Sequence, residues 1–170
     1  MNDGKRTKII LLLIGAIVLL GFLSTVISQK PKAPDVTFTT LQGNKLSLDS
    51  LRGKVVLVNF WATSCPGCIK EMPQLITTHT KYHAQDFETI AVAMSYDPPN
   101  YVVTYTEKNA LPFTVSLDIN GEIAQAFGNV KLTPTSFLID KQGNIVQRTV
   151  GELDFAKLHN LIEEKLKGAL

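Results

Sequence analysis

The chain contains two cysteines, Cys65 and Cys68, and only two residues separate them. A disulfide across so short a loop removes little entropy from the unfolded chain, so the pair makes a poor structural staple. The cysteines follow an apolar run of strand formers, Val55–Trp61, and precede a helical pattern that extends to about His83. Cys65 therefore stands at a predicted helix N-terminus, where unpaired amide groups and the helix dipole favour a thiolate. We predict that Cys65 is the attacking nucleophile and that Cys68 resolves the mixed disulfide.

A metal site is the alternative interpretation of these cysteines. The spacing of Cys65, Cys68, His79 and His83 approaches that of a zinc finger. A finger, however, needs a hairpin before its helix, whereas this Cys pair begins the helix that carries both histidines. The histidines then lie two or more turns away from the thiols, so we predict no metal ligands and no cofactor besides the Cys65–Cys68 disulfide.

The elements that position the cysteines alternate between strands and helices. Predicted strands cover residues 36–40, 45–48, 55–61, 87–95, 113–117, 135–140 and 144–150. Predicted helices cover residues 65–83, 98–109 and 119–127, and a last amphipathic helix follows Asp154 as its N-cap. The first two strands form a hairpin around Gln42-Gly43-Asn44. This order predicts one α/β domain with a mixed central sheet.

The charge distribution indicates the compartment. The chain has 170 residues and a formal net charge of +2, but Ile9–Ile27 carries no charge at all. Such a run is long enough to span a bilayer as a helix, and Lys5, Arg6 and Lys8 before it favour a cytoplasmic N-terminus. We therefore expect a cytoplasmic tail (1–8), a transmembrane signal anchor (9–27), a linker (28–34) and an exported domain (35–170). A cleaved signal peptide is the competing interpretation. The exported part is slightly acidic and has no basic cluster, so nucleic-acid binding is not expected.

Several motifs together resemble a known family. They are residues 33–35 (Ala-Pro-Asp), residues 53–63 (Gly-Lys-Val-Val-Leu-Val-Asn-Phe-Trp-Ala-Thr), the Cys-x-x-Cys, and residues 132–140 (Leu-Thr-Pro-Thr-Ser-Phe-Leu-Ile-Asp). In these motifs the chain resembles the membrane-anchored thiol–disulfide oxidoreductases of the TlpA/ResA type. The resemblance implies a thioredoxin-like three-layer fold with an N-terminal hairpin. It also implies an α-β insertion, to which Pro98–Leu117 corresponds.

The same resemblance implies roles for residues around the cysteines. Pro134 corresponds to a cis proline that faces them, and the backbone of Thr133 would pair with an incoming substrate strand. Glu71 corresponds to an acidic residue near the thiols, where a carboxylate moves protons to and from Cys68. Trp61 is expected to form a wall of the site that contacts substrate. Asn59 stands where thioredoxin has a buried Asp, so Glu71 or water must act as the base.

The sequence therefore predicts a thiol–disulfide oxidoreductase, most simply a reductase of exported protein disulfides. Its expected partners are those disulfide-containing proteins and a membrane protein that donates electrons. We expect a monomer in the bacterial cytoplasmic membrane, with its catalytic domain on the periplasmic or extracytoplasmic side. A disulfide oxidase or isomerase, a peroxide-reducing enzyme and a metal-binding module remain as alternatives.

Overall fold

The computed structural model describes residues 10–11, 13–15 and 31–168. The chain divides into two compact units, Met1–Lys30 and Pro31–Leu170. Within the described ranges, no helix combines the length and apolar character needed to cross a membrane. Most of the predicted anchor, residues 9–27, lies outside those ranges, so the anchor stays a prediction.

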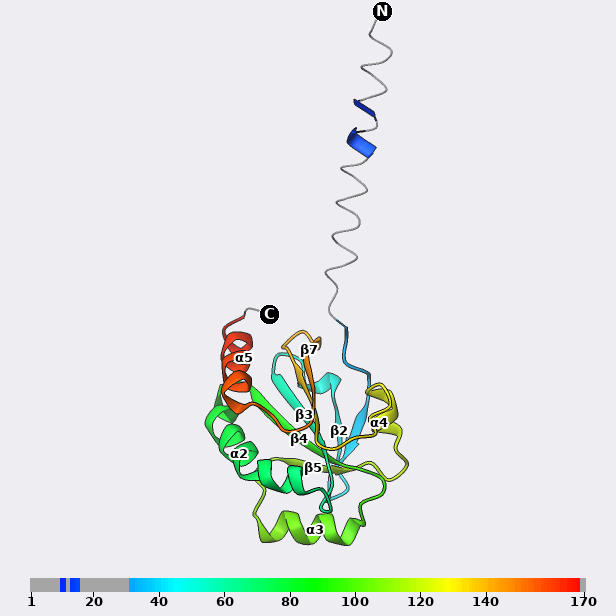
Figure 1. Ribbon diagram of the computed structural model, residues 1–170, viewed down its shortest axis with the longest axis vertical. Coiled ribbons are helices and arrows are strands. Elements are labelled where there is room, and N and C mark those ends of the chain that lie inside the picture. Colours follow the sequence, from blue (N-terminus) through cyan, green and yellow to red (C-terminus); the bar gives the residue numbers. More distant parts are fainter. Residues whose placement is uncertain (1–9, 12, 16–30, 169–170) are drawn as a thin grey trace, which may run out of the picture. The chain divides into compact units, whose positions relative to one another are not determined.

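A five-stranded mixed sheet forms the centre of the second unit (Figure 1). Its strands occur in the order β5 (Thr114–Leu117), β4 (Phe87–Ala93), β3 (Val55–Trp61), β6 (Thr135–Ile139) and β7 (Ile145–Val150). β3, β4 and β5 are parallel, whereas β6 and β7 each run antiparallel to the preceding neighbour. All seven residues of β3 are buried, as expected for a central strand covered on both faces. The prediction of one α/β domain with a mixed sheet is confirmed.

Two hydrophobic cores lie on opposite faces of this sheet and produce three layers. One face packs on α2 (Pro66–Tyr82), α3 (Pro99–Lys108) and α5 (Phe155–Lys167). The other face is covered by α4 (Glu122–Ala126), the short helix η1 (Asp49–Leu51), and the antiparallel hairpin of β1 (Thr37–Thr39) and β2 (Lys45–Ser47). Alternate residues of β3 enter the two cores because successive side chains of a strand point to opposite faces. Leu57 and Trp61 contact the helical layer, and Val58 and Phe60 contact the hairpin layer.

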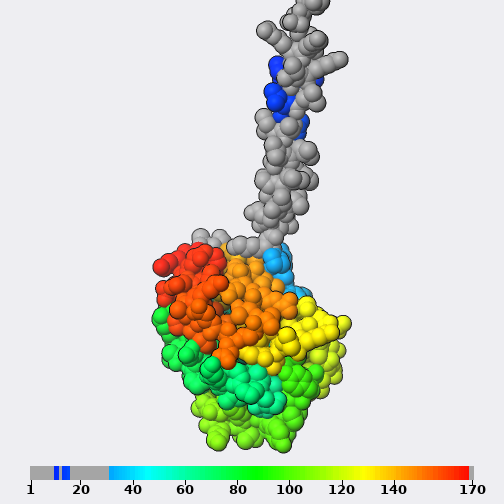
Figure 2. Space-filling view, in the orientation of Figure 1, coloured from blue at the N-terminus to red at the C-terminus, as the bar shows by residue number. Residues whose placement is uncertain are grey.

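Helices α2 and α5 adjoin each other on the surface of the domain, in green and in orange to red in Figure 2. Polar contacts join them along their length. The hydroxyl of Thr78 lies 2.9 Å from Nε2 of His159, and the hydroxyl of Tyr82 donates to Glu163 at 2.7 Å. Asp154 caps α5 by accepting the backbone N–H of Lys157 at 3.1 Å, which confirms the predicted N-cap. These contacts fix the helix that carries the cysteines against the domain.

Candidate active site

Cys65 and Cys68 form a disulfide at the start of α2. Cys65 is the N-cap residue, and its Sγ accepts the backbone N–H of Cys68 at 3.2 Å. Pro66 occupies the first turn, where its missing N–H leaves no bond unmade. Cys65 is half-buried, whereas Cys68 has no exposed surface. The pair is therefore asymmetric, with one cysteine partly exposed and the other enclosed.

The loop that leads into this helix is held by Asp97. Its carboxylate accepts the backbone N–H of Thr63 at 2.6 Å and the Thr63 hydroxyl at 2.5 Å. Asp97 is 4% exposed, so both bonds form in a largely water-free setting, where charge-assisted bonds are strong. The sequence reasoning missed this residue. A signal existed, because Asp97 follows β4 as Cys65 follows β3, and parallel neighbours end at the same edge of a sheet.

Pro134 faces the cysteine turn, as the sequence predicted. The Thr133–Pro134 peptide bond is cis. A methyl group placed on Gly67, between the two cysteines, would lie 3.5 Å from Cδ of Pro134. The carbonyl of Pro134 accepts the N–H of Gly151 at 2.8 Å, which ties this loop to the end of β7. Thr133 is half-buried, and its hydroxyl lies 3.1 Å from that of the exposed Tyr96, a neighbour that the sequence did not reveal.

Glu71 is buried, with 3% of its surface exposed, on the turn of α2 that follows Cys68. Its Oε1 accepts the side-chain amide of Asn59 at 3.0 Å, and its Oε2 accepts the backbone N–H of Leu153 at 3.1 Å. The amide of Asn59 also donates to the Ser136 hydroxyl at 2.9 Å, so β3, β6 and α2 meet in one polar network. Glu71 is therefore not a solvated side chain on the surface of the helix.

Burial raises the pKa of Glu71 above the ordinary value for a glutamate. The hydrogen bonds from Leu153 and Asn59 act in the opposite direction, and the nearby charge of Glu152 adds to the rise. Glu152 itself lies at the rim of the site, where it forms a 2.7 Å ion pair with Lys70. The site therefore contains a carboxyl group that holds its proton to a higher pH than a solvated glutamate would.

Trp61 lies deeper than the sequence suggested. Its side chain has no exposed surface and packs in the core with Cys68, and its ring lies 5.3 Å from that of Tyr105. In this arrangement Trp61 supports the cysteine helix from below and offers no surface to a substrate. The expectation of a substrate-contacting wall needs this correction, because β3 points Trp61 into the helical layer.

The histidines of α2 do not approach the cysteines. His79 lies eleven residues beyond Cys68 on the same helix, a rise of about 16 Å at 1.5 Å per residue. They instead converge with Glu88 of β4, a residue that the sequence reasoning did not consider.

Comparisons with known proteins agree with this geometry. The family model described as Redoxin matches residues 29–162, which is most of the chain. The chain belongs to the redoxin family. The thiol-disulfide oxidoreductase ResA of Bacillus thuringiensis subsp. konkukian is 38% identical to it over 137 residues, which cover 80% of this chain and 75% of that protein.

Solved structures of redoxin relatives share the fold. A thioredoxin-type protein of Neisseria meningitidis matches with a TM-score of 0.76 and 41% identity, over 83% of this chain and 93% of that one. A thiol:disulfide interchange protein of Chlorobium tepidum TLS matches with a TM-score of 0.75 and 28% identity, over 82% and 98%. The thioredoxin-like fold and the TlpA/ResA-type family expected from the sequence are confirmed. This redoxin is a thiol–disulfide oxidoreductase with Cys65 and Cys68 as its redox pair.

Proposed function

We propose that this redoxin is an exported reductase of protein disulfides, anchored in the bacterial cytoplasmic membrane by residues 9–27 and supplied with electrons by a membrane protein. The observation that carries the proposal is the unequal exposure of the two cysteines. A substrate sulfur can approach the half-buried Cys65, whereas the enclosed Cys68 can react only with Cys65. A reductase needs this division, because the buried thiol must stay free to release the substrate.

The reaction begins with both cysteines reduced. The Cys65 thiolate attacks one sulfur of a substrate disulfide, which forms a Cys65–substrate bond and releases the other substrate sulfur as a thiolate. The Cys68 thiolate then attacks Sγ of Cys65, and the second substrate sulfur leaves. The substrate gains two electrons, and the enzyme keeps the Cys65–Cys68 disulfide present in this structure. Two electrons and two protons from a membrane dithiol donor restore the reduced pair.

Glu71 is the proposed proton acceptor for Cys68, which must lose its proton before it attacks. Glu71 lies three residues beyond that cysteine on α2, a spacing that places the two side chains on the same face of the helix. Burial raises its pKa, and this brings its basicity closer to that required at neutral pH. Asn59 orients the carboxylate through the 3.0 Å bond and has no proton of its own to exchange.

The substrate is proposed to lie across the Thr133–Pro134 loop as an extended segment. The backbone of Thr133 can pair with such a segment beside the cysteine turn. Two exposed apolar side chains flank this position, Tyr96 at 56% and Leu132 at 66% exposure. A surface of backbone and apolar contacts suits an unfolded or misoxidised polypeptide, whose sequence around the disulfide varies.

Reduction of a model protein disulfide by the chemically reduced full-length chain tests the activity. Cys65→Ser should abolish turnover, whereas Cys68→Ser should accumulate mixed disulfides that can be isolated and identified. Ser64→Ala, at the exposed neighbour of Cys65, is the matched control and should stay active. Turnover by Cys65→Ser would overturn the assignment of the nucleophile.

The direction of electron flow is tested by the reduction potential of the pair. A reductase should lie near the value of thioredoxin, about −270 mV, whereas a strong oxidant of the DsbA type lies near about −120 mV. A potential close to the second value would establish the disulfide oxidase instead.

The anchor is tested by fractionation of cells that express the full chain. The protein should resist extraction from membranes with alkaline carbonate, and its domain should be open to protease added on the extracytoplasmic side. Recovery of a soluble form that begins after residue 27 would establish a cleaved signal peptide instead.

A further inference from the structure

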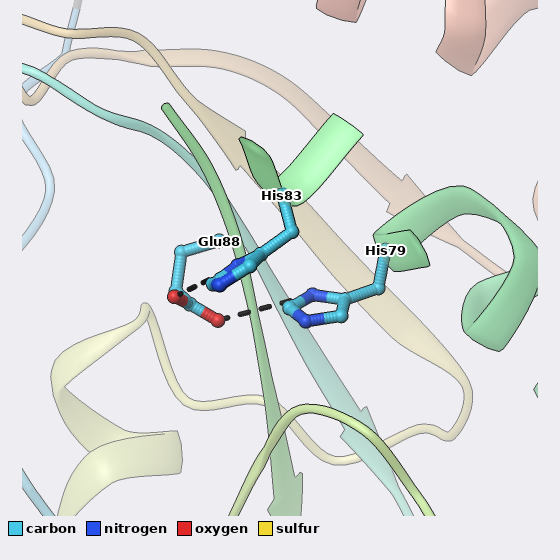
Figure 3. Close-up of side chains that lie close together, drawn as sticks. All are labelled: His79, His83 and Glu88. Atoms are coloured by element: carbon cyan, nitrogen blue, oxygen red, sulfur yellow. Dashed lines mark ion pairs between the residues drawn. The ribbon is translucent and has the colours of Figure 1, made fainter. Parts of the chain in front are cut away.

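A second cluster of reactive side chains lies at the opposite end of α2 from the cysteines, where His79, His83 and Glu88 meet (Figure 3). Nδ1 of His79 lies 3.8 Å from Oε1 of Glu88, and Nδ1 of His83 lies 3.5 Å from Oε2 of the same carboxylate. The two imidazole rings are 4.6 Å apart between centroids. One potential ligand atom from each residue lies within 4.8 Å of the others.

Local structure produces this convergence. His79 and His83 are four residues apart, so the helical repeat places them on one face. The chain then turns through η2 (His83–Gln85) and reverses at Asp86, which adopts a left-handed conformation with φ of 61°. Phe87 begins β4 and enters the core, so the next residue, Glu88, points back toward the last turn of α2. The cluster is therefore built on two rigid elements and the tight turn between them.

His79 has a buried ring nitrogen that is free to bind a cation. It is 4% exposed, and its Nδ1 is buried without a hydrogen-bond partner. The backbone of Pro112 is a hydrogen-bond partner of the ring, and its carbonyl is the accepting group because proline has no N–H. A metal-binding histidine has this arrangement, with one nitrogen donating to a carbonyl and the other presenting its lone pair. The ring of Phe113, 5.6 Å away, holds the imidazole in place.

The other two residues provide charge and access. The Glu88 side chain is 13% exposed, and its Oε1 is steadied by the backbone N–H of Thr89 at 3.1 Å. The His83 side chain is 53% exposed, so the cluster opens to solvent on that side. An ion can enter there, and water can complete its coordination.

We propose that His79, His83 and Glu88 form a binding site for one Zn²⁺ ion, with at least one coordination position left to water. Two imidazoles and one carboxylate are a donor set that zinc uses. Zinc bonds of about 2.0–2.1 Å place tetrahedral ligand atoms about 3.3 Å apart. One ligand atom from each of the three residues lies within 4.8 Å of the others, so side-chain rotations that shorten these separations by up to about 1.5 Å would bring the ligands onto one ion. The bound ion would join the end of α2 to the start of β4.

The site is independent of the redox chemistry. Cys65 and Cys68 are joined in a disulfide, and about 16 Å of helix separates Cys68 from His79. Metal binding must therefore be measured with the oxidised protein, in which the thiols cannot act as ligands. A result obtained in this state does not depend on the direction or the substrate of the oxidoreductase reaction.

The experiment titrates the oxidised full-length chain, purified in mild detergent, with Co²⁺ and with Zn²⁺. Co²⁺ should produce visible d–d absorption that saturates at one ion per chain and is displaced by Zn²⁺. Isothermal titration should yield a Kd for Zn²⁺ of about 10 μM or tighter, and Zn²⁺ should raise the midpoint of thermal unfolding.

Three variants locate the ion. His83→Ala and Glu88→Gln should each weaken Zn²⁺ binding at least about tenfold and remove the thermal shift. His159→Gln, at the third histidine of the chain, is the matched control and should bind like the wild type. Since His83 is largely exposed, its variant should fold, which the fluorescence of the buried Trp61 verifies. The absence of saturable binding by the oxidised wild type up to about 1 mM Zn²⁺ would overturn the proposal, as would wild-type affinity in His83→Ala and Glu88→Gln.

Discussion

Replacement of Asn59 by Asp places a second carboxyl group beside Glu71 in the buried network under the cysteines. In the wild type, the Asn59 amide donates to Oε1 of Glu71 at 3.0 Å, and both side chains are shielded from solvent. The aspartate has nearly the same shape but no N–H, so two oxygens face each other where a donor and an acceptor met. Unless a proton is shared between them, both groups carry a negative charge.

The loss of stability can be calculated from the distance between the side chains at positions 59 and 71. Two unit charges 3.0 Å apart repel by about 5.5 kcal/mol at an effective dielectric constant of about 20. Holding a proton on the pair at pH 7 costs about 4 kcal/mol, because an unfolded aspartate releases it near pH 3.9. Retaining the proton costs less free energy than the charge repulsion, so the pair keeps one proton and Asn59→Asp should lose about 4 kcal/mol of stability at pH 7.

The stability of the variant should fall as the pH rises. Folding raises the pKa of one carboxyl group of the pair in the variant, so the folded variant holds one more proton than its unfolded chain. Stability is then fully present below about pH 4 and falls as the pH rises. Relative to the wild type, whose single Glu71 already has a raised pKa, the loss should steepen by about 1.4 kcal/mol per pH unit between pH 5 and pH 7.

Urea unfolding of the full-length chain at pH 5, 6 and 7 measures this loss, with the disulfide intact. Trp61 is the single tryptophan and is fully buried, so its fluorescence reports unfolding of the domain. The swap Asn59→Asp/Glu71→Gln is the control, because the side-chain amide introduced on α2 can donate to the new carboxylate on β3 and one carboxyl remains. It should remove the extra pH dependence. An Asn59→Asp variant with the pH profile of the wild type, or a swap that keeps the steep profile, would refute the reasoning.

Further perturbations test other contacts, each by urea unfolding of the oxidised chain at pH 7. Asp97→Ala should cost about 3 kcal/mol, because two charge-assisted bonds to Thr63 are lost and its N–H is left unpaired. A loss under about 1 kcal/mol would show that the loop does not depend on Asp97. Asp154→Ala should cost about 1 kcal/mol through loss of the α5 N-cap, and Asp154→Asn should cost much less. Equal losses in these two variants would exclude capping as the cause. Glu152→Gln breaks an exposed ion pair with Lys70 and should change stability by less than about 1 kcal/mol, so a larger change would contradict the surface assignment.

The order of elements could be predicted from local patterns. The fully buried strand β3 matches the predicted bounds, Val55–Trp61, because an unbroken run of apolar strand formers has no other favourable place in an α/β domain. The bounds of α2 follow from Cys65 and Pro66 at its start. The predicted bounds were less accurate for the helix expected over 119–127. This helix is shorter in the structure, Glu122–Ala126, because Gly121 precedes it in a left-handed conformation.

The redox centre was also accessible from the sequence, because both cysteines lie within one turn of a helix and need no distant partner to meet. Pro134 was identified through the motif around it, and its position beside Gly67 agrees with the prediction that it faces the cysteines. The burial of Glu71 could not be predicted, because it depends on Asn59 of β3 and on Leu153 beyond β7. Trp61 was misplaced for a related reason, since the ring that it packs against, Tyr105 of α3, lies 44 residues further along the chain.

The sequence by itself therefore determined the redox pair, the class of fold and the helix N-terminus that favours a thiolate, because each depends on neighbours within a few residues. Tertiary structure alone decided which polar groups meet. It brought Asp97 onto the cysteine loop, enclosed Glu71 under the thiols, and aligned His79 and His83 with Glu88. Those contacts cross between strands and helices, and their geometry follows from sheet register and helix packing, which no local pattern specifies.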